Sequence, residues 1–443
     1  MSSPPNTARN LALELARIIK KAGHDAMFAG GCVRDALLGR TPKDYDIVTS
    51  ARPNEVLELF PGSNEVGAHF GVIIVSRDGQ QIEIATYRND GSYSDNRRPD
   101  SVEFTTAEHD AQRRDFTING LFENPENAEI IDYVGGRADL DARILRAIGD
   151  PTERFQEDAL RMLRAVRFAS HLEFEIEPHT RRALSDQAHL LGKISPERIR
   201  DEFSCILTSS HRRCGIQTLT DSGLIMHIIP ELQETIGCDQ PPQWHPEGDV
   251  YVHTLIMLEM LEDDAPLELC LAVLLHDIGK PLTRTLDETG RIRFNGHDSV
   301  GAEMARSILN RLRYPNRIVD DVVNMVARHM KFMHVQQMRT SKLKRFMAES
   351  TFEHELELHR VDCASSNGFT DNYDFLLTKR DEFANEPLIP DPLITGKDLI
   401  EHGLSPSPRF KEILEIIQTE QLEGRILDRK KALAYLETLI TDP

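Results

Sequence analysis

Residues 30–48, GGCVRDALLGRTPKDYDIV, decide the fold of the N-terminal part of the chain. Two glycines come first, a helical segment follows, and Asp44 and Asp46 then begin a segment that ends in β-branched residues. Side chains at positions i and i+2 of a strand point to the same face, so these two carboxylates would lie side by side. Such a pair is unfavourable unless a cation lies between its members. Mg²⁺, which prefers oxygen ligands and often binds substrate phosphates, is the ion that we expect.

The glycines and the arginine of this stretch suit a bound triphosphate. Gly30 and Gly31 let the backbone approach phosphate oxygens, the following helix offers its N-terminus to anions, and Arg34 adds a charge-assisted contact. Metal ions held by carboxylates can serve both the attacking and the leaving oxygen in nucleotidyl transfer, and Glu83 is a candidate third carboxylate. A glycine-rich turn and a solvated Asp-x-Asp are the alternative interpretation.

The chain changes character near residue 150. Up to there the hydrophobic pattern predicts helices over 8–23, 33–39 and 51–60 and strands over 26–30, 44–50, 71–78 and 81–88. After residue 151 the pattern predicts helices and no further strand. We therefore expect an α+β protein in which an α/β head precedes an all-α remainder.

The bulk composition narrows the class of protein. The chain has 443 residues, 40% of them hydrophobic, and a formal net charge of −20, which argues against a general nucleic-acid coat but not against a nucleic-acid enzyme with a local basic strip. The longest apolar runs are far shorter than the roughly 20 residues of a membrane span. The six cysteines are scattered without a CxxC pair. We expect a cytoplasmic protein with no membrane contact and no obligate protein partner. The oligomeric state stays open.

Several motifs in a fixed order resemble those of the class II nucleotidyltransferases, the tRNA CCA-adding enzymes and bacterial poly(A) polymerases. The likeness spans about residues 25–205 and includes GGCVRDALLG with DYDIVT, HDAQRRDFTING (109–120) and ERFQEDALRMLRAVRFA (153–169). It implies that Asp44 and Asp46 are catalytic and bind Mg²⁺. It also implies nucleotide binding by Gly30, Gly31, Arg34, Asp110, Arg113, Arg114, Asp115, Asn119, Asp158 and Arg161.

The pair Asp158 and Arg161 has a physical interpretation of its own. Residues three apart on a helix share a face, so we expect the two side chains to lie together. A carboxylate only accepts and a guanidinium only donates hydrogen bonds, so the pair could read the Watson–Crick edge of a base. The family uses such a pair to select C or A without a nucleic-acid template. An ordinary ion pair on a helix surface is the alternative.

Two further segments carry expectations from the same resemblance. The loop Asp90–Pro99 resembles the flexible loop that helps the family switch from C to A addition, and its length argues against an enzyme that adds only CC. Glu197 and Arg198, in ISPERIRDEFSCIL (194–207), are expected to stabilise the neck helices.

A second group of chemistry follows in the helical part. The order of its histidines and aspartates resembles the metal site of the HD superfamily, with His253, His276, Asp277 and Asp362 as ligands and His297 and His329 where binuclear members have more. Imidazole with carboxylate suits a divalent transition metal, whose identity stays open. A working phosphohydrolase and a purely structural domain remain alternatives. Lys280 would hold a phosphate or be solvated.

Together these expectations describe a polymerase-β-like nucleotidyltransferase head (1–150), a helical neck (151–210), an HD domain (211–385) and a helical tail (386–443) with basic residues for tRNA phosphates. The resemblance implies addition of CMP and AMP from CTP and ATP to the tRNA 3′ end. The alternatives are an A-adding enzyme or poly(A) polymerase, and an HD phosphohydrolase whose head only binds RNA or nucleotide.

Overall fold

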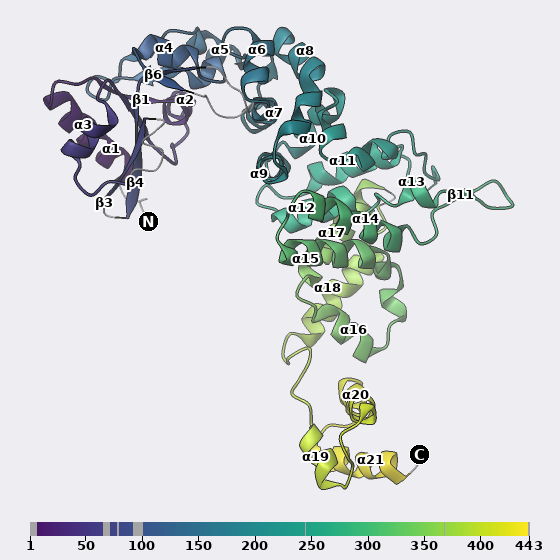
Figure 1. Cartoon of the computed structure of the whole chain (residues 1–443). Coiled ribbons are helices and arrows are strands. Elements are labelled where there is room, and N and C mark those ends of the chain that lie inside the picture. The colour runs from purple at the N-terminus through teal and green to yellow at the C-terminus, as the bar shows by residue number, and fades with distance from the viewer. Residues whose placement is uncertain are drawn as a thin grey trace. The chain divides into compact units, whose positions relative to one another are not determined.

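The computed structural model describes residues 7–64, 71–77, 79–91, 101–243, 245–366 and 368–441. The chain divides into two compact units, residues 1–233 with 311–313 and residues 234–310 with 314–443. A mixed α/β head followed by helices confirms the predicted fold class (Figure 1). The finer division at residues 150, 210 and 385 stays a prediction. Of the loop predicted over residues 90–99, all but the first two residues lie outside the described part.

The first unit contains a six-stranded sheet. Its strands are β1 (Ala26–Ala29), β2 (Asp46–Thr49), β3 (Val72–Arg77), β4 (Gln80–Thr86), β7 (Leu121–Glu123) and β8 (Ile130–Asp132). They lie in the order β3-β4-β2-β1-β7-β8, with β2 and β4 parallel and the other neighbours antiparallel. In β4 the side chains alternate, Ile82 and Ile84 being buried and Glu83 exposed. Gly79 has a φ of +75° and closes the predicted turn between β3 and β4.

Short helices cover and connect the strands of this sheet. α1 (Thr7–Lys21) packs on β1, β2 and β4 through Ala12, Leu15, Ala16 and Ile19, which recur at helical spacing. The other elements of the head are α2 (Gly31–Leu37), α3 (Pro53–Leu59), β5 (Arg88–Asp90), β6 (Val102–Phe104), α4 (Ala107–Gln112), η2 (Thr117–Asn119), α5 (Gly136–Ala142) and β9 (Ile144–Leu145).

The rest of the first unit is helical except for one short strand. Its elements are α6 (Pro151–Glu157), α7 (Leu160–Leu172), β10 (Glu175–Ile176), α8 (Pro178–Gln187), η3 (Ala188–Lys193), α9 (Pro196–Leu207), α10 (Arg212–Asp221), η4 (Leu224–His227) and η5 (Pro230–Thr235). The expectation that no strand follows residue 151 is wrong for β10 and for the β11–β12 hairpin, Thr285–Leu286 with Ile292–Arg293. Two residues are too few for an alternating pattern to appear in the sequence.

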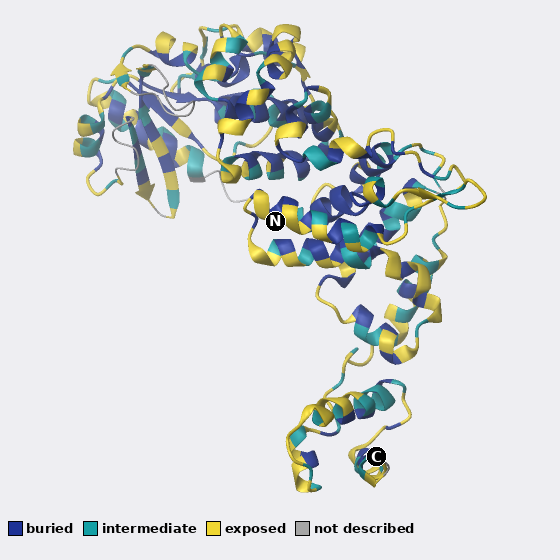
Figure 2. Ribbon diagram, turned by 45° about the vertical axis from the view of Figure 1, so that its right-hand side comes forward, coloured by how far each residue is buried: buried dark blue, intermediate teal, exposed yellow. Residues whose placement is uncertain are grey.

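The second unit is built around an apolar helix. α12 (Leu267–Leu275) is apolar on all sides, and residues 269–275 are buried against α11 (Val250–Met260), α15 (Asn316–Arg328) and α17 (Phe352–Ser365) (Figure 2). Further helices of this unit are α13 (Lys280–Thr283), α14 (His297–Arg311), η6 (His329–Gln337), α16 (Thr340–Met347) and α18 (Asp371–Phe383). In the described part of the chain, no helix is both long and apolar enough to cross a membrane.

The last three helices, α19 (Gly396–Glu401), α20 (Pro408–Leu422) and α21 (Arg429–Thr441), share a small core of their own. Leu399, Ile417, Ala432 and Leu436 are its most buried members.

Candidate functional site

The predicted carboxylates of the head lie at the start of β2. Asp46 is the first residue of that strand and stands opposite Glu83 in the parallel register with β4. Asp44 precedes the strand, so the expected strand geometry does not reach it. Asp46 is solvent-accessible, but crowding by protein atoms and the charge of Glu83 raise the pKa of its carboxyl group to about 6, against a lowering effect of Arg114. A divalent cation would relieve this repulsion, so these donors fit the expected metal.

Gly30 has a conformation and a neighbour that both favour glycine. It precedes α2 with a φ of +73°, in the left-handed region, and an added Cβ would lie 3.2 Å from Nη1 of Arg114. Gly31 has neither restriction, because its added Cβ would lie 3.7 Å from the nearest atom, on Arg34. The first glycine therefore leaves room for an arginine of the second motif.

Gly30→Ala is expected to reduce nucleotide incorporation about ten- to a hundredfold, because the new Cβ would displace Arg114. Gly39 provides a matched control, since its φ is +71° but no described atom lies within 4 Å of an added Cβ. Both variants should lose about 1–3 kcal/mol of unfolding free energy from backbone strain. Equal incorporation by the two variants would show that the position of Arg114 is unimportant.

A chain of polar contacts joins α2, η2 and α7. The buried Arg34 bonds to Asp35 at 2.7 Å and donates to Oδ1 of Asn119, also at 2.7 Å. Asn119 in turn donates to Asp115, and the Asp115 carboxylate accepts from Arg164 at 2.6 Å. Burial raises the pKa of Asp115, but Arg164 and Asn119 outweigh it and lower the pKa to about 2. Three predicted nucleotide-binding residues are thus bonded to one another in this structure.

Asp110 is fully buried beneath two arginines. Its Oδ1 accepts from Arg113 at 2.6 Å and its Oδ2 accepts from Arg114 at 3.1 Å, while the Arg88 backbone N–H donates to Oδ1. Burial raises the pKa of Asp110, and the two guanidinium groups overcome this effect so that the pKa is lowered. Both of its oxygens are thus bonded to protein groups. This carboxylate therefore orients Arg113 and Arg114 and is not placed to bind a ligand directly.

The expectation that Asp158 and Arg161 share a helix face is wrong. Asp158 lies between α6 and α7 in an extended conformation, because its carboxylate accepts the backbone N–H of Leu160 and ends the first helix. Its other partner is Arg198 on α9, at 3.2 Å. Arg161 bonds instead to Glu157, at 2.6 Å. Each member of the predicted pair thus has a partner of its own.

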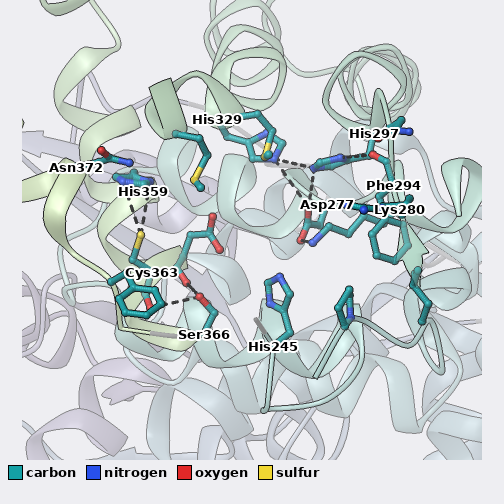
Figure 3. Close-up of a pocket in the computed structure, with 18 of the residues that line it drawn as sticks. His245, Asp277, Lys280, Phe294, His297, His329, His359, Cys363, Ser366 and Asn372 are labelled. Carbon is teal, nitrogen blue, oxygen red and sulfur yellow. Dashed lines mark hydrogen bonds and ion pairs between the residues drawn. The ribbon is translucent and has the colours of Figure 1, made fainter. Parts of the chain in front are cut away.

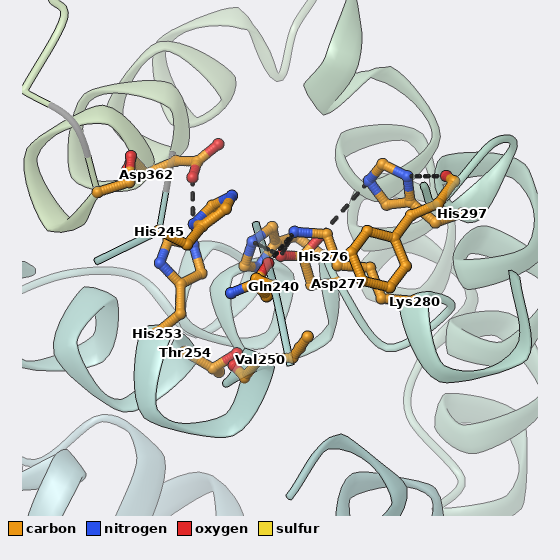
Figure 4. Close-up of polar contacts among 12 residues, drawn as sticks. Gln240, His245, Val250, His253, Thr254, His276, Asp277, Lys280, His297 and Asp362 are labelled. Atoms are coloured by element: carbon orange, nitrogen blue, oxygen red, sulfur yellow. Dashed lines mark hydrogen bonds and ion pairs between the residues drawn. The ribbon is translucent and has the colours of Figure 1, made fainter. Parts of the chain in front are cut away.

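The four predicted HD ligands converge from three elements of the second unit (Figure 4). His253 lies on α11, and its Nε2 is 3.2 Å from Oδ1 of Asp362 on α17. His276 and Asp277 follow the last residue of α12, where the helix ends, and Nε2 of His276 is 3.0 Å from Oδ2 of Asp277. The end of α12 explains how two adjacent residues can direct their side chains into one cluster.

The other two predicted histidines join the same cluster. Nε2 of His297 lies 3.1 Å from Nε2 of His329 and 3.4 Å from Oδ1 of Asp277. The Nδ1 atoms of His276, His297 and His329 lie 2.6–2.8 Å from the backbone carbonyls of Val273, Phe294 and Val326, respectively. A carbonyl only accepts, so Nδ1 carries the proton and the Nε2 lone pair faces the cluster. This is the tautomer that a metal ligand needs.

The cluster has buried ligand atoms that suit a metal ion. Nε2 of His253, Nε2 of His276 and Oδ2 of Asp277 have no hydrogen bond of normal geometry in the described part of the chain, although Oδ2 of Asp277 lies 2.6 Å from the Lys280 ammonium group. Three overlapping groups of possible ligand atoms lie within 4.8 Å of one another: His245, Glu247 and His253; His253, His276 and Asp277; and Asp277, His297 and His329. The carboxylates of the head do not form such a group among the described residues.

The ionisation of the cluster follows from its burial and its close pairs. Burial lowers the pKa of His253, but its close pairing with the carboxylates of Asp362 and Glu247 outweighs that effect and raises the pKa to about 9. Burial and the neighbouring His276 lower the pKa of His329 to about 4. Burial raises the pKa of Asp277, and His276 and Lys280 reverse this, so the pKa is lowered. Negative carboxylate charge therefore persists in the cluster at neutral pH.

A pocket of about 480 Å³ opens beside these residues (Figure 3). Its lining combines Asp277, His297 and His329 with Arg291 and Arg293 of the β11–β12 hairpin and several apolar side chains, including Phe294, Met330, Met333 and Phe369. Lys280 is not solvated, and its positive charge is already paired with a carboxylate. Its buried ammonium group lies 2.6 Å from both Asp277 and Gln240.

The basic residues of the tail differ in their availability. Arg429 forms an ion pair with Asp398, and Arg425 forms one with Glu420. Lys411 is exposed and lies 3.9 Å from Glu415. Some of the predicted basic side chains are therefore already held in close ion pairs within the chain. Contact between the tail and tRNA stays a prediction.

Comparison with known proteins places three families along the chain. The Poly A polymerase head domain matches residues 26–146, the probable RNA- and SrmB-binding site of polymerase A matches 173–236, and the HD domain matches 250–355. Over these residues the chain is similar to poly(A) polymerases and CCA-adding enzymes. The CCA-adding enzyme of Streptococcus thermophilus is 45% identical over 225 residues, which are 51% of this chain and 56% of the relative.

Other CCA-adding enzymes are also similar to this chain. The Bacillus subtilis CCA-adding enzyme is 39% identical over 58% of this chain and 66% of its own length. The chain thus aligns with little more than half of the first curated relatives. The crystal structure of the Bacillus stearothermophilus CCA-adding enzyme in complex with CTP is 28% identical, with a TM-score of 0.76 over 99% of this chain and 98% of that chain. A Thermotoga maritima CCA-adding enzyme complexed with tRNA shares the fold, at 19% identity and a TM-score of 0.64.

The site residues predicted from the sequence do not include the side chains that hold them in place. Arg164, the partner of Asp115, lies three residues after Arg161 on α7, and this spacing could have drawn attention to it. Arg198 was expected to stabilise the neck, but its bond to Asp158, 40 residues away, has no local signal. Glu247 stands within HPEGDVYVH and was not separated from the histidines around it.

Proposed function

We propose that this protein is a template-independent RNA nucleotidyltransferase that adds CMP and AMP, from CTP and ATP, to the 3′ end of tRNA. The observation that carries this proposal is the end-to-end likeness to a CCA-adding enzyme in complex with CTP, together with Asp46 and Glu83 opposite each other on the neighbouring strands β2 and β4. The two curated relatives described above are CCA-adding enzymes, so an A-adding enzyme or a poly(A) polymerase is less favoured.

In the proposed reaction the RNA 3′-hydroxyl attacks the α-phosphate of the nucleotide, and pyrophosphate leaves. Asp44 and Asp46 would hold Mg²⁺, which when bound stabilises the developing negative charge and lowers the pKa of the hydroxyl. Gly30 leaves space beside Arg114, and Asp110 fixes the direction of that guanidinium group. Arg34, buried at the end of the polar chain through Asn119, would approach the triphosphate only after exchanging these bonds.

Selection of the base would depend on Asp158 and Arg161. The bond between Arg198 and Asp158 allows a specific test of this role. Arg198→Met should free the Asp158 carboxylate and change the ratio of CTP to ATP incorporation about tenfold, since a hydrogen bond to a charged group is worth about 1.5–3 kcal/mol. Arg200→Met on the same helix removes a guanidinium group that pairs with the exposed Asp201 and should keep the wild-type ratio. An unchanged ratio in both variants would count against base selection by Asp158.

We further propose that the second unit is a metal-dependent phosphohydrolase. The buried Nε2 atoms of His253 and His276, beside the Asp277 carboxylate, support a divalent metal, which when bound would supply an activated water molecule. Arg291 of the pocket lining would attract a phosphate group, whereas Arg293 already bonds to Asp287 at 2.9 Å. Hydrolysis of a phosphomonoester such as p-nitrophenyl phosphate with Mn²⁺ or Ni²⁺ tests this activity separately from nucleotide incorporation.

A further inference from the structure

Glu247 lies outside the expected HD ligands but contacts two histidines of the second unit. Its Oε1 is 2.7 Å from Nδ1 of His253 and 2.9 Å from Nδ1 of His245. A carboxylate at neutral pH only accepts hydrogen bonds, so both imidazoles must donate from Nδ1. Nε2 of His253 is then the nitrogen left for a metal ion, which it can bind after releasing its own proton, and this atom lies 3.2 Å from Oδ1 of Asp362 inside the cluster.

This contact distinguishes His253 from the other cluster histidines. His276, His297 and His329 each donate from Nδ1 to a neutral backbone carbonyl. The hydroxyl of Ser365 also approaches Nδ1 of His253, but at 3.3 Å, whereas the Glu247 oxygen is at 2.7 Å. A negative acceptor makes the imidazole a stronger metal ligand than a neutral acceptor does. Of the described contacts to the four Nδ1 atoms, the one from Glu247 is therefore the strongest.

The segment before α11 holds Glu247 in this position. Two residues after it, Asp249 caps the helix by accepting the backbone N–H of Val252 and also accepts the backbone N–H of Gly237. Glu247 is itself buried, with 7% of its side chain exposed, and its Oε2 has no hydrogen-bond partner among the described residues. Burying a carboxylate with one unsatisfied oxygen is unfavourable, so its two bonds to imidazoles must offset part of that penalty.

We propose that Glu247 is a positioning residue of the HD metal centre, which fixes the tautomer and orientation of His253 and so sets the metal affinity of that ligand. The same oxygen fixes His245 with its Nε2 available to the pocket, which His245 lines (Figure 3). The inference rests on the proposed metal centre of the second unit. It adds an outer carboxylate to the ligand set that the sequence predicts.

The test is a calorimetric titration of the full chain, free of metal, with Mn²⁺ and separately with Ni²⁺. Glu247→Gln keeps a neutral acceptor and should weaken binding about tenfold, and Glu247→Ala should weaken it about a hundredfold, because loss of an outer ligand partner lowers metal affinity by this order. Glu355→Gln is the matched control. Glu355 is also buried, with one oxygen bonded to Thr351 and the other 3.4 Å from Arg328, but no described contact joins it to a cluster histidine.

Thermal unfolding of the metal-free variants separates positioning from simple support of the fold. We expect similar losses of stability in Glu247→Gln and Glu355→Gln, with weakened metal binding in the first alone. Equal metal affinity in these two variants, with the wild type still binding, would overturn the role of Glu247 and leave the metal centre in place. A wild-type protein that binds neither Mn²⁺ nor Ni²⁺ would overturn the metal centre and the role of Glu247 with it.

Discussion

Asp46→Asn is expected to reduce nucleotide incorporation about a thousandfold or more. The substitution preserves the size of the side chain but removes the charge that a cation beside the triphosphate needs, and a thousandfold loss corresponds to about 4 kcal/mol of transition-state stabilisation. Asp46 stands opposite Glu83, and the negative charge of Glu83 helps to raise the pKa of Asp46. The two carboxylates therefore already interact electrostatically. The rate of incorporation of labelled CMP and AMP into a tRNA transcript, at saturating Mg²⁺, measures the effect.

The matched control for this variant is Glu103→Gln. It neutralises an exposed carboxylate on β6 of the same unit and should leave the rate within about twofold of wild type, as expected for a surface substitution. Asp44→Ala should lower incorporation in the same direction as Asp46→Asn. If Asp46→Asn and Glu103→Gln incorporated nucleotide equally, the assignment of the catalytic carboxylates would be wrong.

Asp277→Asn is expected to weaken binding of Mn²⁺ or Ni²⁺ by at least about a hundredfold. Replacing a residue that only orients a metal ligand lowers the affinity by about ten- to a hundredfold, and losing a ligand should cost at least as much. Asp277 is shared by two of the three groups of possible ligand atoms, so its loss would damage both. The substitution also leaves the buried Lys280 without its negative partner, and breaking a buried ion pair costs about 3–5 kcal/mol. Metal affinity and unfolding free energy must therefore be measured on the same samples.

Lys280→Met separates these two effects. It removes the ammonium group that lies 2.6 Å from Asp277 and retains the carboxylate, so metal binding should be kept or strengthened. The double variant Asp277→Asn with Lys280→Met should recover stability and still fail to bind metal. Restored binding in the double variant would mean that Asp277 is an ion-pair partner and not a metal ligand.

Local patterns predicted the head well because its elements depend on short-range features. The turn at Gly79 needs a left-handed residue, and the alternation of Ile82, Glu83 and Ile84 gives a strand with one buried face. The six HD residues were also brought together as expected. Their order along the chain follows helix ends and helix faces, which pattern and resemblance both indicate.

Residues whose partners are distant in the sequence could not be placed in this way. The segment EDALRMLR reads as a continuous helix, but Asp158 ends one helix by accepting the N–H of Leu160 and receives Arg198 from 40 residues away. Arg34 suits a triphosphate by type, but 85 residues later Asn119 supplies a partner that helps to bury it. Side-chain pairing across the fold decides such cases, and no local propensity records it.

The most direct test of nucleotide addition uses three tRNA transcripts, ending before CCA, after C and after CC, with Mg²⁺ and labelled CTP and ATP supplied separately and together. We expect the shortest transcript to be completed to CCA and addition to stop there. Addition of A alone to the CC-ending transcript, long A tails, or no incorporation at all would each contradict this expectation.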